Sequence, residues 1–164
     1  MEHSIKIKTV ERKDFIEYIS LHWTDRKWLV DVYLENDNEY SNLGNGIGLY
    51  SNNCLIGFLF YKTYENYRDT KFWVLKTKEN YPEIIHPDTN VFWENNLLEI
   101  HPQYRFKGYG SLLLTNLYNM TPIGSVLVSK SEHTENHISF YKKNLFIQNI
   151  KTVSPRVYYF FKTK

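Results

Sequence analysis

The sequence is poor in cysteine, with the single residue Cys54 in 164. One cysteine cannot form an intramolecular disulfide, which argues against a disulfide-stapled secreted scaffold. Because Cys54 lies in an apolar run, we expect its side chain to pack in the core. His101, His133 and His137 have no metal-ligand spacing with one another or with Cys54, so the sequence predicts no metal site.

Long hydrophobic runs and long runs of one charge are also missing. The first ten residues alternate charge and apolarity without a signal peptide or membrane anchor, so we expect a cytoplasmic protein with no membrane partner. Acids and bases are interspersed, and the net charge of +2 predicts no nucleic-acid partner. What the chain does have is 42% hydrophobic and 17% aromatic residues, which indicates one folded domain over residues 1–164.

Hydrophobic spacing predicts the elements of the first half. Period-two alternation predicts a strand at 5–10, and helical spacing predicts a helix at 14–19 and a second one at 24–33. The stretch 44–48 carries three glycines without the spacing of a dinucleotide fingerprint, so we interpret it as a flexible loop. Residues 65–90 keep no sustained period and could form a lid or an extra strand.

A hairpin is predicted between these segments. Two apolar runs, 47–50 and 54–61, flank Ser-Asn-Asn at 51–53, and asparagine tolerates the positive φ of tight turns. The second half then alternates strands and helices. The predicted strands are 91–100, 126–129, 146–153 and 157–161, with a turn at 154–155, and the predicted helices are 108–119 and 136–143.

The strongest chemical signal lies where an apolar strand runs into a polar turn and then an apolar helix. Gly108 and Gly110 have no Cβ, so the N–H groups of 106–111 can converge on an anion at the positive end of the helix. Arg105 and Lys107 flank the turn and add charge that neutralises phosphates. The simpler alternative is an ordinary strand-turn-helix connection with glycines for turn geometry.

Two segments resemble one protein family. Residues 105–110, Arg-Phe-Lys-Gly-Tyr-Gly, match the Arg/Gln-x-x-Gly-x-Gly/Ala signature of the GNAT (GCN5-related N-acetyltransferase) superfamily. Residues 136–146 resemble the family's Asn-x-x-Ala-x-x-Phe-Tyr-x-Lys-x-Gly-Phe segment. The departures are Phe106 in place of the glycine common after the arginine, Ser139 in place of alanine, and Leu145 in place of glycine. The resemblance covers roughly the C-terminal half, and the first half agrees only in its order of elements.

The resemblance implies an α/β (α+β) fold. It has a central mixed, mostly antiparallel sheet of about seven strands, flanked by about four helices and splayed between strands 4 and 5, where acetyl-CoA enters. The implied activity is direct transfer of the acetyl group from acetyl-CoA, the acyl-donor substrate, to a primary amine of a small molecule or protein. No metal is implied, and we expect a monomer or homodimer.

The resemblance also implies roles for single residues. Tyr141 stands at the position of the general acid that protonates the departing thiolate, and a backbone N–H in 98–100 stabilises the oxyanion. Glu94 is the candidate base, or Glu99 if a bulge reverses the strand's parity. Asn136 caps the next helix and binds near the pantetheine arm. The residues expected to bind acetyl-CoA are Leu98, Ile100, Arg105, Phe106, Lys107, Gly108, Tyr109, Gly110, Ser111, Asn136, Tyr141 and Lys143.

Other interpretations stay open from the sequence. Tyr141 could pack in the core with Phe140, and each glutamate could be a solvated surface charge. The chain could retain coenzyme A as a structural or sensing ligand without turnover. It could also use a longer acyl or an aminoacyl donor, which needs a roomier cleft near Ile100 and Tyr141. The sequence does not identify the amine acceptor.

Overall fold

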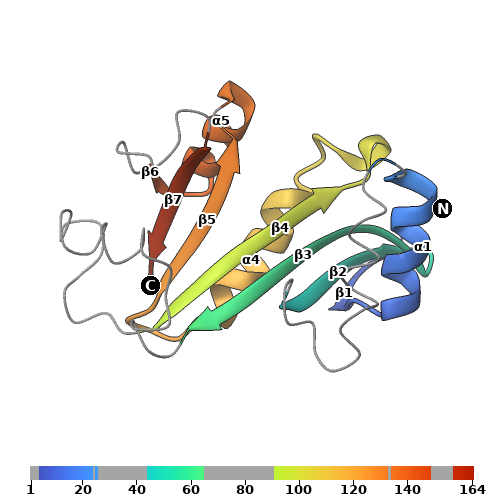
Figure 1. Cartoon of the computed structure of the whole chain (residues 1–164), viewed down its shortest axis with the longest axis horizontal. Coiled ribbons are helices and arrows are strands. Elements are labelled where there is room, and N and C mark those ends of the chain that lie inside the picture. The colour runs from blue at the N-terminus through green and yellow to red at the C-terminus, as the bar shows by residue number, and fades with distance from the viewer. Residues whose placement is uncertain (1–3, 24, 26–43, 65–90, 133, 149–156) are drawn as a thin grey trace. The chain divides into compact units, whose positions relative to one another are not determined.

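The computed structural model describes residues 4–23, 25, 44–64, 91–132, 134–148 and 157–164 (Figure 1). Within these ranges the strands follow the order β1-β2-β3-β4-β5-β7-β6 in one seven-stranded sheet, accompanied by three α-helices. The chain divides into two compact units. The first comprises Met1–Tyr61 and Asn96–Leu114, and the second comprises Lys62–Asn95 and Thr115–Lys164. The predicted mixed sheet is confirmed.

The first unit begins with three antiparallel strands. β1 (Ile5–Thr9) pairs with β2 (Asn45–Ser51), and β2 pairs with β3 (Cys54–Tyr64), as Figure 1 shows. Asn52 and Asn53 form the turn between β2 and β3 with φ of 50° and 65°. This left-handed conformation is one that asparagine adopts more readily than most residues. The predicted hairpin is confirmed.

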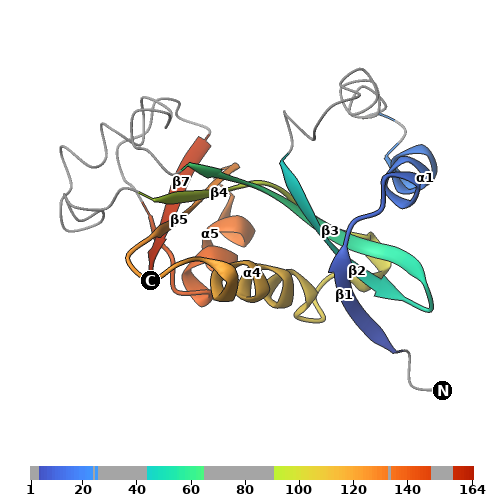
Figure 2. The same cartoon turned by 90° about the horizontal axis from the view of Figure 1, so that it is seen from below.

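Helix α1 (Arg12–His22) supplies three of the six buried side chains in one core cluster of this unit. Phe15, Tyr18 and Ile19 are buried at helical spacing, so one face of α1 is apolar. The rings of Phe15 and Tyr18 meet Phe58 of β3 edge-on, with centroids 5.2 and 5.1 Å apart. Figure 2 shows α1 against one face of β2 and β3. Burial of each of these side chains contributes roughly 1.5–3 kcal/mol.

The interpretation of 44–48 as a flexible loop is wrong, because β2 begins at Asn45. Gly46 and Gly48 lie inside the strand, where packing excludes a side chain. A Cβ at Gly46 would lie 2.8 Å from the Phe60 ring, and one at Gly48 would lie 2.6 Å from the Tyr50 ring. The glycines therefore let β2 approach the aromatic core closely.

The expected burial of Cys54 is also wrong, since this residue is exposed. Cys54 is the first residue of β3 and follows the turn directly. The apolar run that surrounds it is buried only from Ile56 onward.

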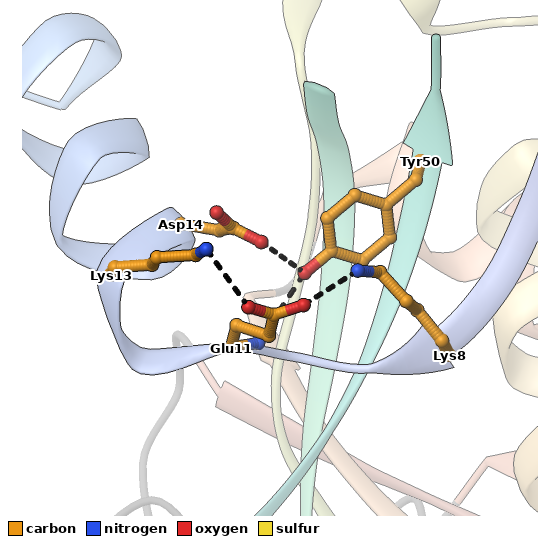
Figure 3. Close-up of polar contacts among 5 residues, drawn as sticks. All are labelled: Lys8, Glu11, Lys13, Asp14 and Tyr50. Carbon is orange, nitrogen blue, oxygen red and sulfur yellow. Dashed lines mark hydrogen bonds and ion pairs between the residues drawn. The ribbon is translucent and has the colours of Figure 1, made fainter. Parts of the chain in front are cut away.

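A polar cluster fixes the link between β1 and α1 (Figure 3). The buried Tyr50 hydroxyl donates to Asp14 at 2.9 Å and accepts from the Glu11 N–H at 3.3 Å. The Glu11 carboxylate pairs with Lys8 at 2.7 Å and Lys13 at 3.3 Å. Burial raises the pKa of Tyr50, so its hydroxyl remains a proton donor. The cluster anchors the start of α1 on β2.

The second unit is built around a parallel pair of strands. The first four residues of β4 (Phe92–Ile100) pair with β5 (Val126–Glu132), from Phe92↔Val126 to Asn95↔Ser129. The described ladder ends there, although β4 continues to Ile100 and β5 to Glu132. β7 (Val157–Thr163) pairs antiparallel with β5 and with β6 (Ile147–Gln148).

Helices α4 (Tyr109–Met120) and α5 (Glu135–Lys143) agree with the helices predicted at 108–119 and 136–143. The expectation that Asn136 caps α5 is wrong. The cap is Thr134, whose side-chain oxygen accepts from the His137 N–H at 3.2 Å. The helix begins one residue earlier than predicted, so Asn136 lies inside its first turn, exposed.

Several predictions lie outside the described residues. They are the second helix apart from Asp25, the lid or strand at 65–90, most of the strand at 146–153 and the turn at 154–155. Among the helices that the structure does describe, none is both long and apolar enough to span a membrane. The described residues also hold no cluster of three or more histidine, cysteine, aspartate or glutamate side chains suited to a metal.

Candidate functional site

The end of β4 leads into a tight turn in the first unit. A short 3-10 helix, η3 (Pro102–Tyr104), follows the strand, and the Nδ1 atom of His101 accepts from the Gln103 N–H at 3.3 Å. Phe106 and Gly108 then adopt φ of 61° and 83°. These two left-handed residues reverse the chain just before α4 begins, so the predicted strand-turn-helix connection is present.

The backbone N–H groups of this turn lack hydrogen-bond partners within the described chain. Gly108 stands before the helix, and its carbonyl accepts from the Leu112 N–H at 3.0 Å. Among the described residues, no hydrogen bond engages the N–H groups of Lys107, Gly108, Tyr109 or Gly110. A Cβ on Gly108 would meet nothing within 4 Å, so the space beside it is open, and its φ of 83° favours glycine. Free N–H groups at a helix N-terminus bind anions.

The two cations that flank the turn differ in their surroundings. Arg105 donates from Nε to the Ile100 carbonyl at 2.9 Å and from Nη2 to the Glu99 carboxylate at 2.6 Å. Its guanidinium thus ties the turn to the end of β4, and Glu99 offsets part of its charge. The Lys107 ammonium lies 5.4 Å from the centroid of the Tyr104 ring.

The last residues of β4 are held closely against β3. The His101 N–H donates to the Ile56 carbonyl at 2.8 Å. A Cβ on Gly57 would lie 2.6 Å from the Ile100 side chain and 3.0 Å from the Glu99 carbonyl. Ile100 is buried and Leu98 is half buried. This packing fixes the main chain in which the oxyanion donor was predicted.

Tyr141 lies in the second unit and is buried, with 5% of its surface exposed. Its ring stacks on Phe160 at 4.4 Å and 17° and meets Phe146 edge-on at 5.4 Å. The end of α5 adds a backbone clamp, because the Phe146 N–H donates to the Tyr141 carbonyl and the Leu145 N–H to the Lys142 carbonyl, each at 3.0 Å. These two bonds form a Schellman motif, with Leu145 at a φ of 66°.

A buried serine contacts the Tyr141 hydroxyl, and a buried asparagine contacts that serine. Ser129 Oγ donates to the Tyr141 hydroxyl at 2.8 Å, and Asn95 Nδ2 donates to Ser129 Oγ at 2.7 Å. Burial raises the pKa of Tyr141, and the bonds from Ser129 and Asn95 oppose that rise. Sequence reasoning missed both residues, although a serine at the end of the apolar run 126–128 and an asparagine inside a strand are signals of buried hydrogen bonds.

The two candidate bases are placed differently. Glu94 lies in the second unit with 4% of its surface exposed, and it accepts from the Tyr64 hydroxyl at 3.0 Å. Burial, followed by the Glu94 charge and hydrogen bond, raises the pKa of Tyr64 to about 12. Glu99 lies in the first unit, paired with Arg105. The predicted catalytic residues therefore fall in different units, with Tyr141 and Glu94 in the second and Glu99 in the first.

Comparisons with known proteins identify the fold. No family model matches the chain, and no curated protein matches its sequence. Solved structures do match. NAA60 of Arabidopsis thaliana in complex with acetyl-CoA is 15% identical, with a TM-score of 0.63 over 98% of this chain and 100% of that one.

Two further matches are microbial. The Bacillus subtilis N-acetyltransferase YlbP in complex with coenzyme A is 15% identical, with a TM-score of 0.63 over 98% of this chain and 97% of that one. The PaiA N-acetyltransferase of Thermoplasma acidophilum in complex with coenzyme A is 18% identical, with a TM-score of 0.60 over 98% and 99%. The chain therefore has the fold of the GNAT superfamily, as its two sequence motifs indicate.

Proposed function

We propose that the chain is an acetyl-CoA-dependent N-acetyltransferase that transfers the acetyl group directly to a primary amine. The observation that carries this proposal is the turn before α4, where four successive N–H groups from Lys107 to Gly110 are free of hydrogen bonds within the described chain. The solved structures with the same fold include complexes with acetyl-CoA and coenzyme A, which supports this ligand.

The turn suits the diphosphate of coenzyme A. N–H groups at the start of α4 add the partial positive charge of the helix to their own hydrogen bonds. Lys107 supplies a full positive charge on the same turn. Arg105 acts in this proposal mainly by holding the turn, through its bonds to Ile100 and Glu99.

We assign the general acid to Tyr141. A thiolate leaving group has a reference pKa near 8.5 and needs a proton at neutral pH for efficient departure. Because burial raises the pKa of Tyr141, its phenol is protonated there. Such a positioned acid typically contributes a factor of about 10²–10⁴ to the rate.

Glu94 is our choice of base. It is buried, and its carboxylate is oriented by the Tyr64 hydroxyl. Glu99 is less suitable, because its carboxylate already pairs with Arg105 at 2.6 Å. A base is needed because a free alkyl amine, with a pKa near 10, is largely protonated at neutral pH.

The test is release of coenzyme A from acetyl-CoA with a panel of small amines and peptides, followed by chromatography. Tyr141→Phe should lower kcat about a hundredfold or more while leaving acetyl-CoA affinity nearly unchanged. Tyr118→Phe is the matched control, because the Tyr118 hydroxyl donates to the Thr163 carbonyl and has no assigned role in the reaction. If both variants turn over at the wild-type rate, Tyr141 is not the acid.

A second candidate function is a module that binds coenzyme A without turnover. The small exposed fraction of Tyr141, 5%, favours it, since an acid must reach its thiolate. Calorimetric binding of acetyl-CoA without release in the presence of any amine would support this candidate over the enzyme. Propionyl-CoA and longer thioesters in the same assay test the donor size. Cytoplasmic location and a monomeric or homodimeric state remain predictions.

A further inference from the structure

Three buried polar side chains form a line in the second unit. Asn95, Ser129 and Tyr141 have 3%, 0% and 5% of their surfaces exposed. They come from β4, β5 and α5, and the parallel ladder places Asn95 directly beside Ser129. Nδ2 of Asn95 lies 2.7 Å from Oγ of Ser129, which lies 2.8 Å from the Tyr141 hydroxyl. The line ends at the proposed acid.

The chemistry of these groups gives the line a direction. An amide nitrogen only donates, so Ser129 Oγ accepts from Asn95. Ser129 has a single hydroxyl proton and donates it to Tyr141. The Tyr141 oxygen therefore accepts in this bond, and its own proton is directed away from Ser129.

The Asn95 amide meets Ser129 through its nitrogen. As placed, Asn95 Oδ1 is the one buried side-chain atom of the described residues that lacks a hydrogen-bond partner. An unsatisfied buried acceptor carries a desolvation cost.

The Tyr141 ring is also fixed in place. Stacking on Phe160 and the edge contact with Phe146 limit its rotation, and the backbone bond from Phe146 holds its main chain. The remaining degree of freedom is rotation of the hydroxyl proton about the C–O bond of Tyr141. The hydrogen bond from Ser129 restricts that rotation.

We propose that Asn95 and Ser129 are positioning residues that hold the Tyr141 proton toward the leaving thiolate and stabilise the phenolate that remains. The inference rests on the proposed acetyl transfer. In that step the amine nitrogen bonds to the thioester carbon, the C–S bond breaks, and sulfur takes the Tyr141 proton. The acceptor nitrogen loses a proton to base or solvent, and the phenolate regains one from solvent. The Ser129 hydroxyl binds the Tyr141 oxygen more strongly once that oxygen is negative.

The experiment is a double-mutant cycle on kcat with Ser129→Ala and Tyr141→Phe. Loss of a hydrogen bond to a charged oxygen predicts a kcat about ten- to a hundredfold lower for Ser129→Ala, with an unchanged KM for acetyl-CoA. In the Tyr141→Phe background the same change should have no further effect, since there is no proton left to position. Ser129→Thr keeps the hydroxyl and should restore most of the rate.

Ser125→Ala is the control. Ser125 is a buried serine just before β5, and its hydroxyl donates to the Pro122 carbonyl, so its loss should leave kcat unchanged. If Ser129→Ala does not fold, Ser129→Cys keeps a similar volume with only a weak donor and should show the same loss.

Three results would overturn the inference. Wild-type kcat in Ser129→Ala and Ser129→Cys removes the positioning role. Additive losses in the double mutant assign the Ser129 effect to general packing, while the acetyl transfer and Tyr141 keep their support. Absence of release by the wild-type chain with every amine removes the proposed function itself, and the positioning role with it.

Discussion

Replacement of Leu145 by glycine should stabilise the protein. Leu145 lies two residues after the end of α5 at a φ of 66°, in the position of the Schellman motif where glycine is the most frequent residue. Its side chain is 75% exposed, so it contributes little buried surface. The substitution removes the steric conflict between the leucine Cβ and the left-handed backbone.

The magnitude follows from two opposing terms. Removing a non-glycine residue from the left-handed region stabilises the folded chain by roughly 1–2 kcal/mol. Glycine also gives the unfolded chain more conformational freedom, which destabilises the folded state by about 0.4–1 kcal/mol. Leu145→Gly should therefore stabilise the chain by about 0.5–1 kcal/mol. For a chain of this length that corresponds to a Tm higher by roughly 1–4 °C.

Thermal unfolding followed by circular dichroism measures the effect. Leu145→Ala is the control, because it removes the exposed side chain but keeps the Cβ, and its Tm should stay near that of the wild type. The reasoning fails if alanine raises Tm as much as glycine does, or if glycine lowers it. Phe106→Gly repeats the test at a second site, since Phe106 is 98% exposed at a φ of 61°.

Two further predictions concern the turn before α4 and the end of β4. Gly108→Val should weaken acetyl-CoA binding at least about tenfold, because a β-branched side chain is strained at a φ of 83° and would crowd the phosphates. Gly124→Val has the same φ and equally open surroundings, so calorimetry should give it wild-type affinity; equal affinities for both variants would contradict the phosphate site. Acid should destabilise the fold, because burial, His22 and Arg105 lower the pKa of His101. The neutral ring is favoured on folding, so this stability is present above the unfolded pKa of about 6.5 and is lost as pH falls through the lower folded pKa. Urea unfolding at several pH values between 8 and 5 gives the free energy of unfolding as a function of pH. This free energy should fall less steeply with falling pH for His101→Asn than for wild type. Equal pH dependence would remove His101 as the cause.

Local patterns predicted most of the elements. The alternation at 5–10, the apolar strand at 91–100 and the helical spacing at 108–119 each report on a single segment, and each matches an element in the structure. The turn at Asn52 and Asn53 could be predicted because asparagine favours the backbone conformation that both residues adopt. Motif order within 105–146 likewise pointed to the fold.

What the sequence could not predict depends on residues far apart in the chain. Gly46 is a strand residue because Phe60 and Val10 occupy the space beside it, and neither lies near it in sequence. In the sequence Ser129 looks like an ordinary strand residue, and only the pairing of β4 with β5 shows that Asn95 lies beside it. Arg105 pairs with Glu99. The sequence alone does not distinguish this ion pair from a contact between Arg105 and a ligand, because the geometry of the turn decides which one forms.

The exposed position of Cys54 affects how the proposed reaction can be followed. A disulfide dye that detects free coenzyme A will also react with this thiol, and since the sequence has one cysteine, each chain adds one equivalent to the background. The same thiol offers a single attachment point for a fluorescent maleimide, so one probe per molecule can be placed at the start of β3 without engineering a new site.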